Sequence, residues 1–481
     1  MARTLSPLCM IAALLLGCSQ TADLFGQKSK AKAPDSPTLV APAPMVAPVD
    51  PSGVMPAGST PAQLVDLPEG DSYLTNLQTL IEATNLSAYH KLGQHGQNLT
   101  IAILDNGFAG LNHSIGNRLP PDTTLVKPPV DQMQDTTHGL KLAEIVYAMA
   151  TGKASYAADV PGPRMLLLNT DGFTNLQAAV ATVIAEKADI VLYAQVWQYG
   201  GNFDGKGFIN AEINKATAAG ILWINAAGNL GQTTFNASVI DSSSDASQVV
   251  LPYAGRYVRF TVARDQTPVT AVLSWNDFQD TKEYITAQDL DLIIEDEAHH
   301  VVGSSRLHQT GVAPDPLATP DLLYSAHARE QISTILNVGT YYARIEDHSH
   351  NFNAASVLRL SIDGENLRLL DLSGGNTLGI PADNATVLTV GASDVDFSGA
   401  QVDSAGKTIK PEAQITSSVV FSDGESHVGT SSASAIVAGA LAVYISAYGP
   451  LDRSKILDLM SAGTLAGPRS DSSKAYSFKL K

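Results

Sequence analysis

Short apolar segments alternate with helical segments over residues 98–229, and this alternation limits the fold more than any other feature. The apolar segments are residues 98–108, 164–170, 189–197 and 221–229. A strand without a polar face has to be covered on both sides, which is typical of parallel sheets. The sequence therefore predicts an α/β fold with a doubly wound, mostly parallel sheet between two layers of helices.

A different pattern interrupts this alternation between about residues 242 and 370. Segments such as RYVRFTVA, DLDLIIED and TYYARIED alternate apolar and polar residues with a period of two. That period predicts antiparallel strands with one buried face, as in a sandwich or jelly roll. A strand at 385–394 and a small-residue helix around 430–448 then resume the first pattern. We therefore expect an all-β domain inserted into the α/β domain.

The N-terminus predicts export. One arginine precedes an apolar run over residues 8–16, which is too short to span a membrane comfortably. The sequence Leu-Leu-Gly-Cys at 15–18 resembles the lipobox of bacterial lipoproteins. The resemblance implies cleavage before Cys18, a lipid on Cys18 and, with Ser19 next, a place at the outer membrane or cell surface. An ordinary cleaved signal peptide is the alternative.

Residues 19–65 are rich in proline, alanine and valine and have no strand or helix periodicity, which predicts a semi-extended tether. The expected organisation is a signal peptide at 1–18, the tether at 19–65, the first part of the α/β domain at 66–241, the β-sandwich at 242–370 and the second part at 371–481.

Charge and cysteine content exclude some classes of partner. The 481-residue chain has a formal net charge of -17 and no dense run of lysine or arginine. This argues against nucleic acid and against an anionic membrane surface as partners, so a lipid anchor would be the membrane contact. Both cysteines, Cys9 and Cys18, precede the tether, so the folded part has neither disulfide nor thiol chemistry.

Four polar residues stand at the ends of predicted elements: Asp105, His138, Asn229 and Ser431. Each alone is commonly a turn or cap residue. Active sites of open α/β sheets lie beyond the carboxyl ends of the strands, where the four would meet. Together they fit acyl transfer: an aspartate orients an imidazole, the imidazole takes a serine proton, and an amide with a backbone N–H stabilises the oxyanion.

The segments around these residues resemble the subtilisin-like serine proteases over most of residues 80–465 outside the insert. LTIAILDNGF is similar to the catalytic-aspartate strand, THGLKLAEIV to the histidine helix, INAAGN to the oxyanion motif and VGTSSASAIVAGALA to the serine helix. The resemblance implies that Asp105, His138 and Ser431 are catalytic and that Asn229 binds the oxyanion. It also implies a serine endopeptidase that acts on proteins or peptides and needs no cofactor for its chemistry.

Three features depart from the family pattern. Leu140 stands where threonine is usual, Ala435 where proline is usual, and residues 193–197 (YAQVW) where relatives carry a Ser-Leu-Gly substrate wall. Substrate specificity is therefore not implied by the resemblance. The departures also leave a second hypothesis, a catalytically degenerate fold that serves as a binding or scaffold lipoprotein through its β-sandwich.

Two other hydrolase classes fit less well. An esterase of the α/β-hydrolase type needs Gly-x-Ser-x-Gly with its histidine last, whereas His138 precedes Ser431 here. An acid protease of the sedolisin type is disfavoured, because His138 and Asn229 fit the neutral Asp-His-Ser scheme.

The predicted insert resembles the β-sandwich that follows the catalytic domain in some alkaline subtilisin-like proteases. Its carboxylates offer oxygen ligands for a structural calcium ion, with a purely structural role as the alternative. These carboxylates are Asp277, Asp289, Asp291 and Asp296. The pairs His299-His300 and His348/His350 are expected to be exposed loop residues, because a zinc site would need a third convergent ligand.

Overall fold

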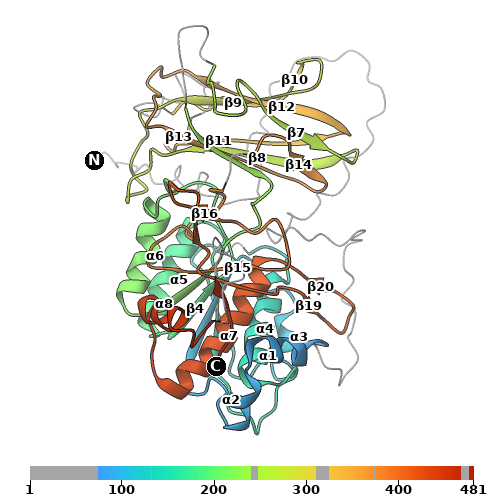
Figure 1. Cartoon of the computed structure of the whole chain (residues 1–481), viewed down its shortest axis with the longest axis vertical. Helices are drawn as coiled ribbons and strands as arrows, with labels where there is room; N and C mark the ends of the chain where they lie inside the picture. Colours follow the sequence, from blue (N-terminus) through green and yellow to red (C-terminus); the bar gives the residue numbers. More distant parts are fainter. Residues whose placement is uncertain (1–73, 132, 240–247, 310–323, 373–374, 467–475) are drawn as a thin grey trace, which may run out of the picture.

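An eight-stranded parallel sheet forms the centre of the α/β part (Figure 1). The computed structural model describes residues 74–481 except 132, 240–247, 310–323, 373–374 and 467–475, so the predicted signal peptide, Cys18 and the tether lie outside the described residues. In sheet order the strands are β2 (Thr124–Val126), β3 (Arg164–Asn169), β1 (Thr100–Asp105), β4 (Ile190–Tyr193), β5 (Leu222–Ala226), β15 (Leu388–Ala392), β18 (Ala413–Ile415) and β21 (Tyr476–Ser477).

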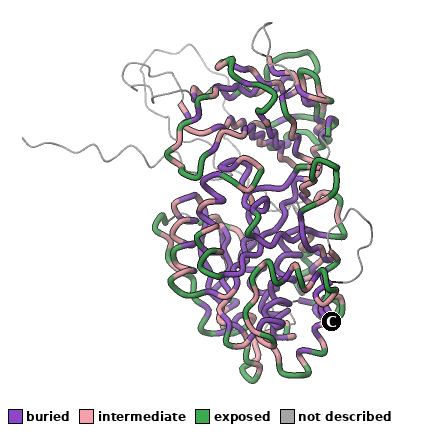
Figure 2. Tube along the Cα trace, turned by 60° about the vertical axis from the view of Figure 1, so that its left-hand side comes forward, coloured by how far each residue is buried: buried purple, intermediate pink, exposed green. Residues whose placement is uncertain are grey.

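Helices cover both faces of this sheet. They are α1 (Leu77–Thr84), α2 (Ser87–Lys91), α3 (Leu111–Ser114), α4 (His138–Thr151), α5 (Phe173–Ala185), α6 (Phe208–Ala218), α7 (Thr430–Tyr448) and α8 (Arg453–Ser461). Successive residues of β1 face opposite sides, so Ile101 and Ile103 pack with α4 and α7, whereas Ala102 and Leu104 pack with α5 and α6. All four side chains are fully buried, as Figure 2 illustrates for the sheet interior, and the doubly wound prediction is confirmed.

Small residues let α7 pack closely against α4. A β-carbon at Gly439 would lie 2.6 Å from Met149 Cβ and 2.7 Å from the Val146 carbonyl oxygen, so only glycine fits there. Within the described residues α7 is the helix long and apolar enough to cross a membrane, but most of it is buried inside the fold. It is therefore a core helix, and its close packing fixes the position of its first turn.

Two antiparallel sheets form the inserted domain, drawn above the α/β part in Figure 1. One contains β10 (Val301–Ser305), β9 (Leu290–Glu295), β12 (Gly339–Asp347), β7 (Val258–Val262) and β14 (Leu367–Leu369). The other contains β11 (Arg329–Leu336), β8 (Thr267–Trp275), β13 (Val357–Asp363) and β6 (Thr234–Ser238). Apolar residues of both sheets belong to one buried cluster, so the chain contains additional antiparallel sheets beside the parallel one.

Two short hairpins follow the insert in the chain. One joins β16 (Gln401–Val402) to β17 (Thr408–Lys410), and the other joins β19 (Val419–Val420) to β20 (Ser426–His427). The second hairpin leads directly into α7. Lys141 of α4 forms a salt bridge with Asp423 of this hairpin, with Nζ 3.2 Å from Oδ2. The salt bridge connects the hairpin to the helix that begins at His138.

One predicted boundary differs from the structure. The insert begins with β6, before residue 242, because Thr234–Ser238 pairs with β13 in the register Thr234↔Ser361.

The first two helices are separate elements. Asn85 adopts φ 61° and ends α1, and α2 begins two residues later. A left-handed residue interrupts the helical hydrogen bonds, and asparagine tolerates that conformation well.

Candidate active site

The four residues singled out in the sequence stand at the carboxyl edge of the central sheet. Asp105 is the last residue of β1, and His138 is the first residue of α4. Asn229 follows β5, and Ser431 is the second residue of α7. All four are buried or nearly so, with exposed fractions of 0% for Asp105, 4% for His138, 8% for Asn229 and 4% for Ser431.

Asp105 and His138 form a buried pair. His138 Nδ1 lies 2.7 Å from Asp105 Oδ2, and the Asn106 backbone N–H donates to Asp105 Oδ1 at 2.9 Å. A carboxylate accepts hydrogen bonds, so Nδ1 carries the proton and the basic lone pair is placed on Nε2. This is the tautomer that a general base needs when it acts through Nε2.

Gly139 explains why the histidine can approach the strand end so closely. A β-carbon at this position would lie 2.6 Å from Asp105 Cβ, 2.6 Å from Phe108 Cε1 and 2.7 Å from the Gly107 carbonyl oxygen. The first turn of α4 therefore rests directly on the end of β1. The His-Gly sequence is thus a packing requirement of the Asp105–His138 pair.

The turn before Ser431 is held by Asn229. Asn229 Oδ1 accepts hydrogen bonds from the Thr430 N–H and the Thr430 hydroxyl, both at 3.1 Å. Because a backbone N–H can only donate, the accepting atom is the amide oxygen, and Nδ2 lies on the other side of the amide. Gly429 has φ 142°, a conformation that favours glycine and lets the chain turn into α7. The Asn229 side chain is thereby fixed beside the start of the helix.

Gln195 contacts both members of the Asp105–His138 pair, a role that the sequence analysis missed. Its side-chain Nε2 lies 3.2 Å from Asp105 Oδ2 and 3.4 Å from His138 Nδ1, and its backbone carbonyl oxygen accepts from Asn225 Nδ2 at 3.3 Å. Gln195 belongs to the segment 193–197, whose departure from the family pattern was the signal that pointed to it. It donates to the carboxylate and so fixes the orientation of Asp105.

The other two residues that depart from the family pattern lie in the hydrophobic core. Leu140 and Ala435 are buried in the cluster between the sheet and the layer of α4 and α7. They alter packing around the helices and place no new polar group beside Asp105, His138 or Ser431.

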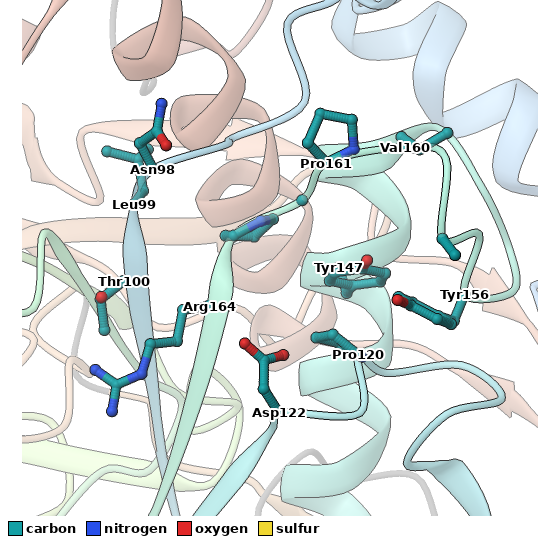
Figure 3. A pocket seen from close by; sticks show the side chains of 13 residues that line it. Asn98, Leu99, Thr100, Pro120, Asp122, Tyr147, Tyr156, Val160, Pro161 and Arg164 are labelled. Carbon is teal, nitrogen blue, oxygen red and sulfur yellow. The ribbon is translucent and has the colours of Figure 1, made fainter.

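A separate pocket of about 430 Å³ lies at the opposite edge of the sheet (Figure 3). It is lined by Thr100 and Arg164, the first residues of β1 and β3, and by side chains that include Asp122, Tyr147 and Tyr156. Because Asp105 is at the far end of β1, this pocket is remote from the candidate site.

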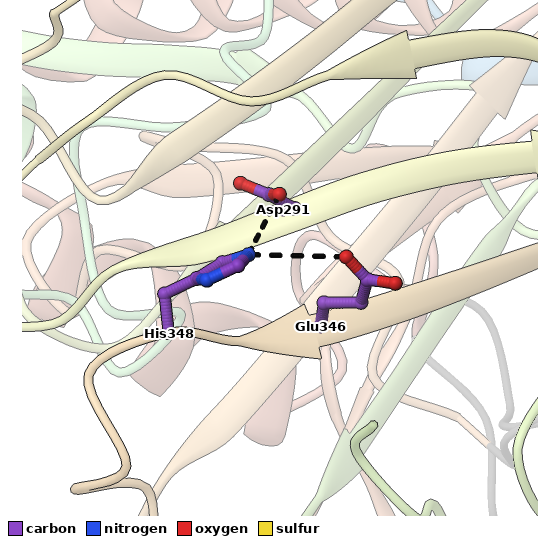
Figure 4. A group of neighbouring side chains, drawn as sticks. All are labelled: Asp291, Glu346 and His348. Carbon is purple, nitrogen blue, oxygen red and sulfur yellow. Dashed lines mark hydrogen bonds and ion pairs between the residues drawn. The ribbon is translucent and has the colours of Figure 1, made fainter. Parts of the chain in front are cut away.

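The inserted domain contains a group of three possible metal ligands, Asp291, Glu346 and His348 (Figure 4). His348 Nε2 lies 2.8 Å from Asp291 Oδ2 and 3.8 Å from Glu346 Oε2. Arg306 is 3.6 Å from both carboxylates, and Arg344 also bonds Glu346. His348 is exposed just after the end of β12, as predicted, and it also contacts these two carboxylates, which two arginines already balance.

The other carboxylates proposed for calcium also have protein partners. Asp277 accepts from Tyr284, Thr286 and the Ala287 N–H, Asp289 is paired with His308, and Asp296 accepts from the Ala298 and His300 N–H groups. These contacts give each carboxylate a structural role, and calcium in the module stays a prediction.

Comparisons with known proteins agree with the fold. No protein-family model matches the sequence, and no curated protein does. Among solved structures, the CspB protease of Clostridium perfringens matches with a TM-score of 0.51 and 14% identity, over 84% of this chain and 97% of that chain. A cold-adapted subtilisin-like serine proteinase matches with a TM-score of 0.37 and 12% identity, over 80% of this chain and 89% of that chain. MycP1 from Mycobacterium smegmatis matches with a TM-score of 0.36 and 13% identity, over 88% of this chain and 86% of that chain.

The class of the protein follows from the fold. The chain has the subtilisin-like α/β fold, with additional antiparallel sheets. The match to the CspB protease covers 97% of that chain, so the likeness extends over its whole fold. The similarity therefore concerns the fold alone. The chemistry at the carboxyl edge of the sheet has to be argued from the residues of this chain.

Proposed function

We propose that this protein is a serine endopeptidase that hydrolyses peptide bonds through an acyl-enzyme. His138 Nε2 takes the proton of the Ser431 hydroxyl as Ser431 Oγ bonds to the substrate carbonyl carbon. The tetrahedral oxyanion is bound by Asn229 Nδ2 and the Ser431 N–H. The C–N bond then breaks, and His138 returns the proton to the leaving amine.

Deacylation repeats these steps with water as the nucleophile. His138 takes a proton from the water, the oxygen bonds to the acyl carbon, and Ser431 Oγ leaves with the proton. Asp105 keeps its charge throughout and stabilises the imidazolium that forms twice in each cycle.

The observation that carries this proposal is the buried Asp105–His138 contact of 2.7 Å at the sheet edge where the first turn of α7 carries Ser431. A buried carboxylate is costly unless it has specific partners, and here the partners are the imidazole, the Asn106 N–H and Gln195. The fold similarity to a protease is independent support. Mass spectrometry of a peptide mixture incubated with the purified chain tests the proposal, since new termini are expected and an unchanged mixture would favour the binding-protein hypothesis.

Gln195→Leu is expected to lower kcat/KM by about 10- to 100-fold, because a hydrogen bond to a charged group contributes about 1.5–3 kcal/mol. Without this donor the Asp105 carboxylate loses a partner and holds the imidazole less firmly in the orientation that a general base needs. Steady-state kinetics measure the loss.

The matched control for this variant is Gln177→Leu, which removes a glutamine donor to Glu212 on the far helices. It should keep kcat/KM within a few-fold of the parent. An unchanged kcat/KM in Gln195→Leu would show that Gln195 does not position Asp105 for the reaction.

We further propose that the protein is anchored to the outer membrane or cell surface by a lipid on Cys18. The lipobox-like sequence before Cys18 supports this proposal. Since a lipid-modified cysteine needs its thiol, Cys18→Ser should move the protein from the membrane fraction to the soluble fraction. Equal membrane retention of both proteins after fractionation would rule the anchor out.

A further inference from the structure

Val196 fills the space beside the backbone that precedes Asn229. A β-carbon at Gly228 would have the three Val196 carbons Cγ2, Cγ1 and Cβ as its nearest atoms, the first at 3.1 Å. A β-carbon at Gly379 would lie 2.4 Å from Val196 Cβ. The isopropyl group is therefore held between two glycine backbones. It remains partly exposed, unlike the residues on either side of it.

Hydrogen bonds fix the frame around this valine. The Trp197 N–H donates to the Ile380 carbonyl oxygen at 2.7 Å, and the Ile380 N–H donates back at 3.0 Å. The Gly228 N–H donates to the Thr430 hydroxyl at 3.1 Å, in the turn before Ser431. Both walls of the space are thus backbone. The Gly379 wall is tied to the segment that carries Val196, and the Gly228 wall to the start of α7, so the valine has little room to move aside.

The order of the strands places Val196 in the middle of the site. The neighbours β1, β4 and β5 end, in this order, at Asp105, at the segment with Gln195 and Val196, and at the segment with Gly228 and Asn229. A carbonyl group that reaches both the His138 side and Asn229 must lie across the end of β4. The α-carbon of the acyl residue is about 1.5 Å from that carbonyl carbon. Its side chain therefore starts beside Gly228, where the valine is.

We infer that Val196 is a specificity-determining residue that restricts the acyl residue, the one whose carbonyl is attacked, to glycine or alanine. The inference rests on the proposed peptidase function and names its substrate class. A larger side chain would need the volume that the isopropyl group holds between Gly228 and Gly379. A difference of one methylene in an apolar pocket changes kcat/KM by about 10- to 200-fold.

The test compares kcat/KM of the full chain for peptides that differ only in the acyl residue, with glycine, alanine, leucine or phenylalanine there. The parent should favour alanine over phenylalanine by at least about 10-fold, and Val196→Gly should raise the phenylalanine-to-alanine ratio by about 10- to 100-fold. Val196→Ala should raise it less, and it keeps the test valid if the glycine variant does not fold. Val302→Ala, at a half-buried valine of the inserted domain, should leave the ratio unchanged.

Labelling with a small fluorophosphonate separates this inference from the proposed function. A labelled parent that cleaves after phenylalanine as fast as after alanine would overturn the inference and leave the peptidase function in place. Folded, labelled Val196 variants with the ratio of the parent would overturn it as well. A folded parent that is not labelled would overturn the peptidase function and this inference with it.

Discussion

Replacing Ser431 by alanine is expected to lower kcat/KM for peptide hydrolysis by about 10³-fold or more. The variant lacks the oxygen that bonds to the substrate carbonyl, so no acyl-enzyme forms. Ser431 is 4% exposed, and alanine fits a helix whose neighbouring residues are already small, so the fold should be retained. Initial rates of peptide cleavage, with thermal unfolding to confirm the fold, measure the effect.

Ser446→Ala is the matched control, because Ser446 lies near the other end of the same helix, where its hydroxyl bonds to the Val443 carbonyl oxygen and to Gln94. It should keep the activity of the parent. Peptide hydrolysis by Ser431→Ala within a few-fold of the parent would assign the nucleophile to another residue.

Asp105→Asn is expected to lower kcat by about 10⁴-fold. The asparagine has nearly the same shape, but its amide group can donate to His138 Nδ1 and so favours the tautomer with the proton on Nε2. That nitrogen then cannot accept the proton of Ser431. Because Asp105 is fully buried, water does not replace the lost carboxylate. Steady-state kinetics at the pH optimum of the parent measure the loss.

The control for this change is Asp189→Asn. Asp189 Oδ2 accepts a hydrogen bond of 2.8 Å from the Thr100 N–H, at the opposite end of β1 from the site. This variant should retain kcat within a few-fold, and a comparable loss in both variants would mean that the effect of Asp105→Asn is structural.

Much of the fold could be predicted from periodicity, because strands buried on both faces have to be apolar throughout. The switch to a period of two then indicated the inserted sheets. The start of the insert was wrong, since Thr234–Ser238 is short and its burial changes from buried to exposed along the strand without alternating. Its membership in the second sheet depends on pairing with β13, more than a hundred residues away, which no local pattern reveals.

The insert interrupts the chain without separating the two halves of the site. Strand β15 pairs with β5 in parallel register, with Leu388 beside Ile224 and Val390 beside Ala226. The strand that precedes Asn229 and the first strand after the insert therefore lie side by side in one sheet, and the chain beyond β15 leads on to Ser431. Motif order along the sequence was enough to predict this meeting.

The neighbours of the four site residues could not be predicted. Gln195 and Val196 follow a strand and had no recognisable motif of their own. Their positions depend on strand order, which places the end of β4 between those of β1 and β5. The glycines at 228 and 379 were the sequence feature that could have pointed to the position of Val196. A glycine is often needed where a side chain packs directly against the backbone, and Val196 packs against both.

The most direct test of the central claim is covalent labelling of the purified full chain with a fluorophosphonate, followed by peptide mapping. We predict one modified residue, Ser431, and no labelling of Ser431→Ala. Labelling of His138→Ala should be slowed strongly, because the serine proton has lost its acceptor. A folded chain that stays unlabelled, or one labelled at a residue other than Ser431, would contradict the assignment of this protein as a serine peptidase with an Asp105–His138–Ser431 site.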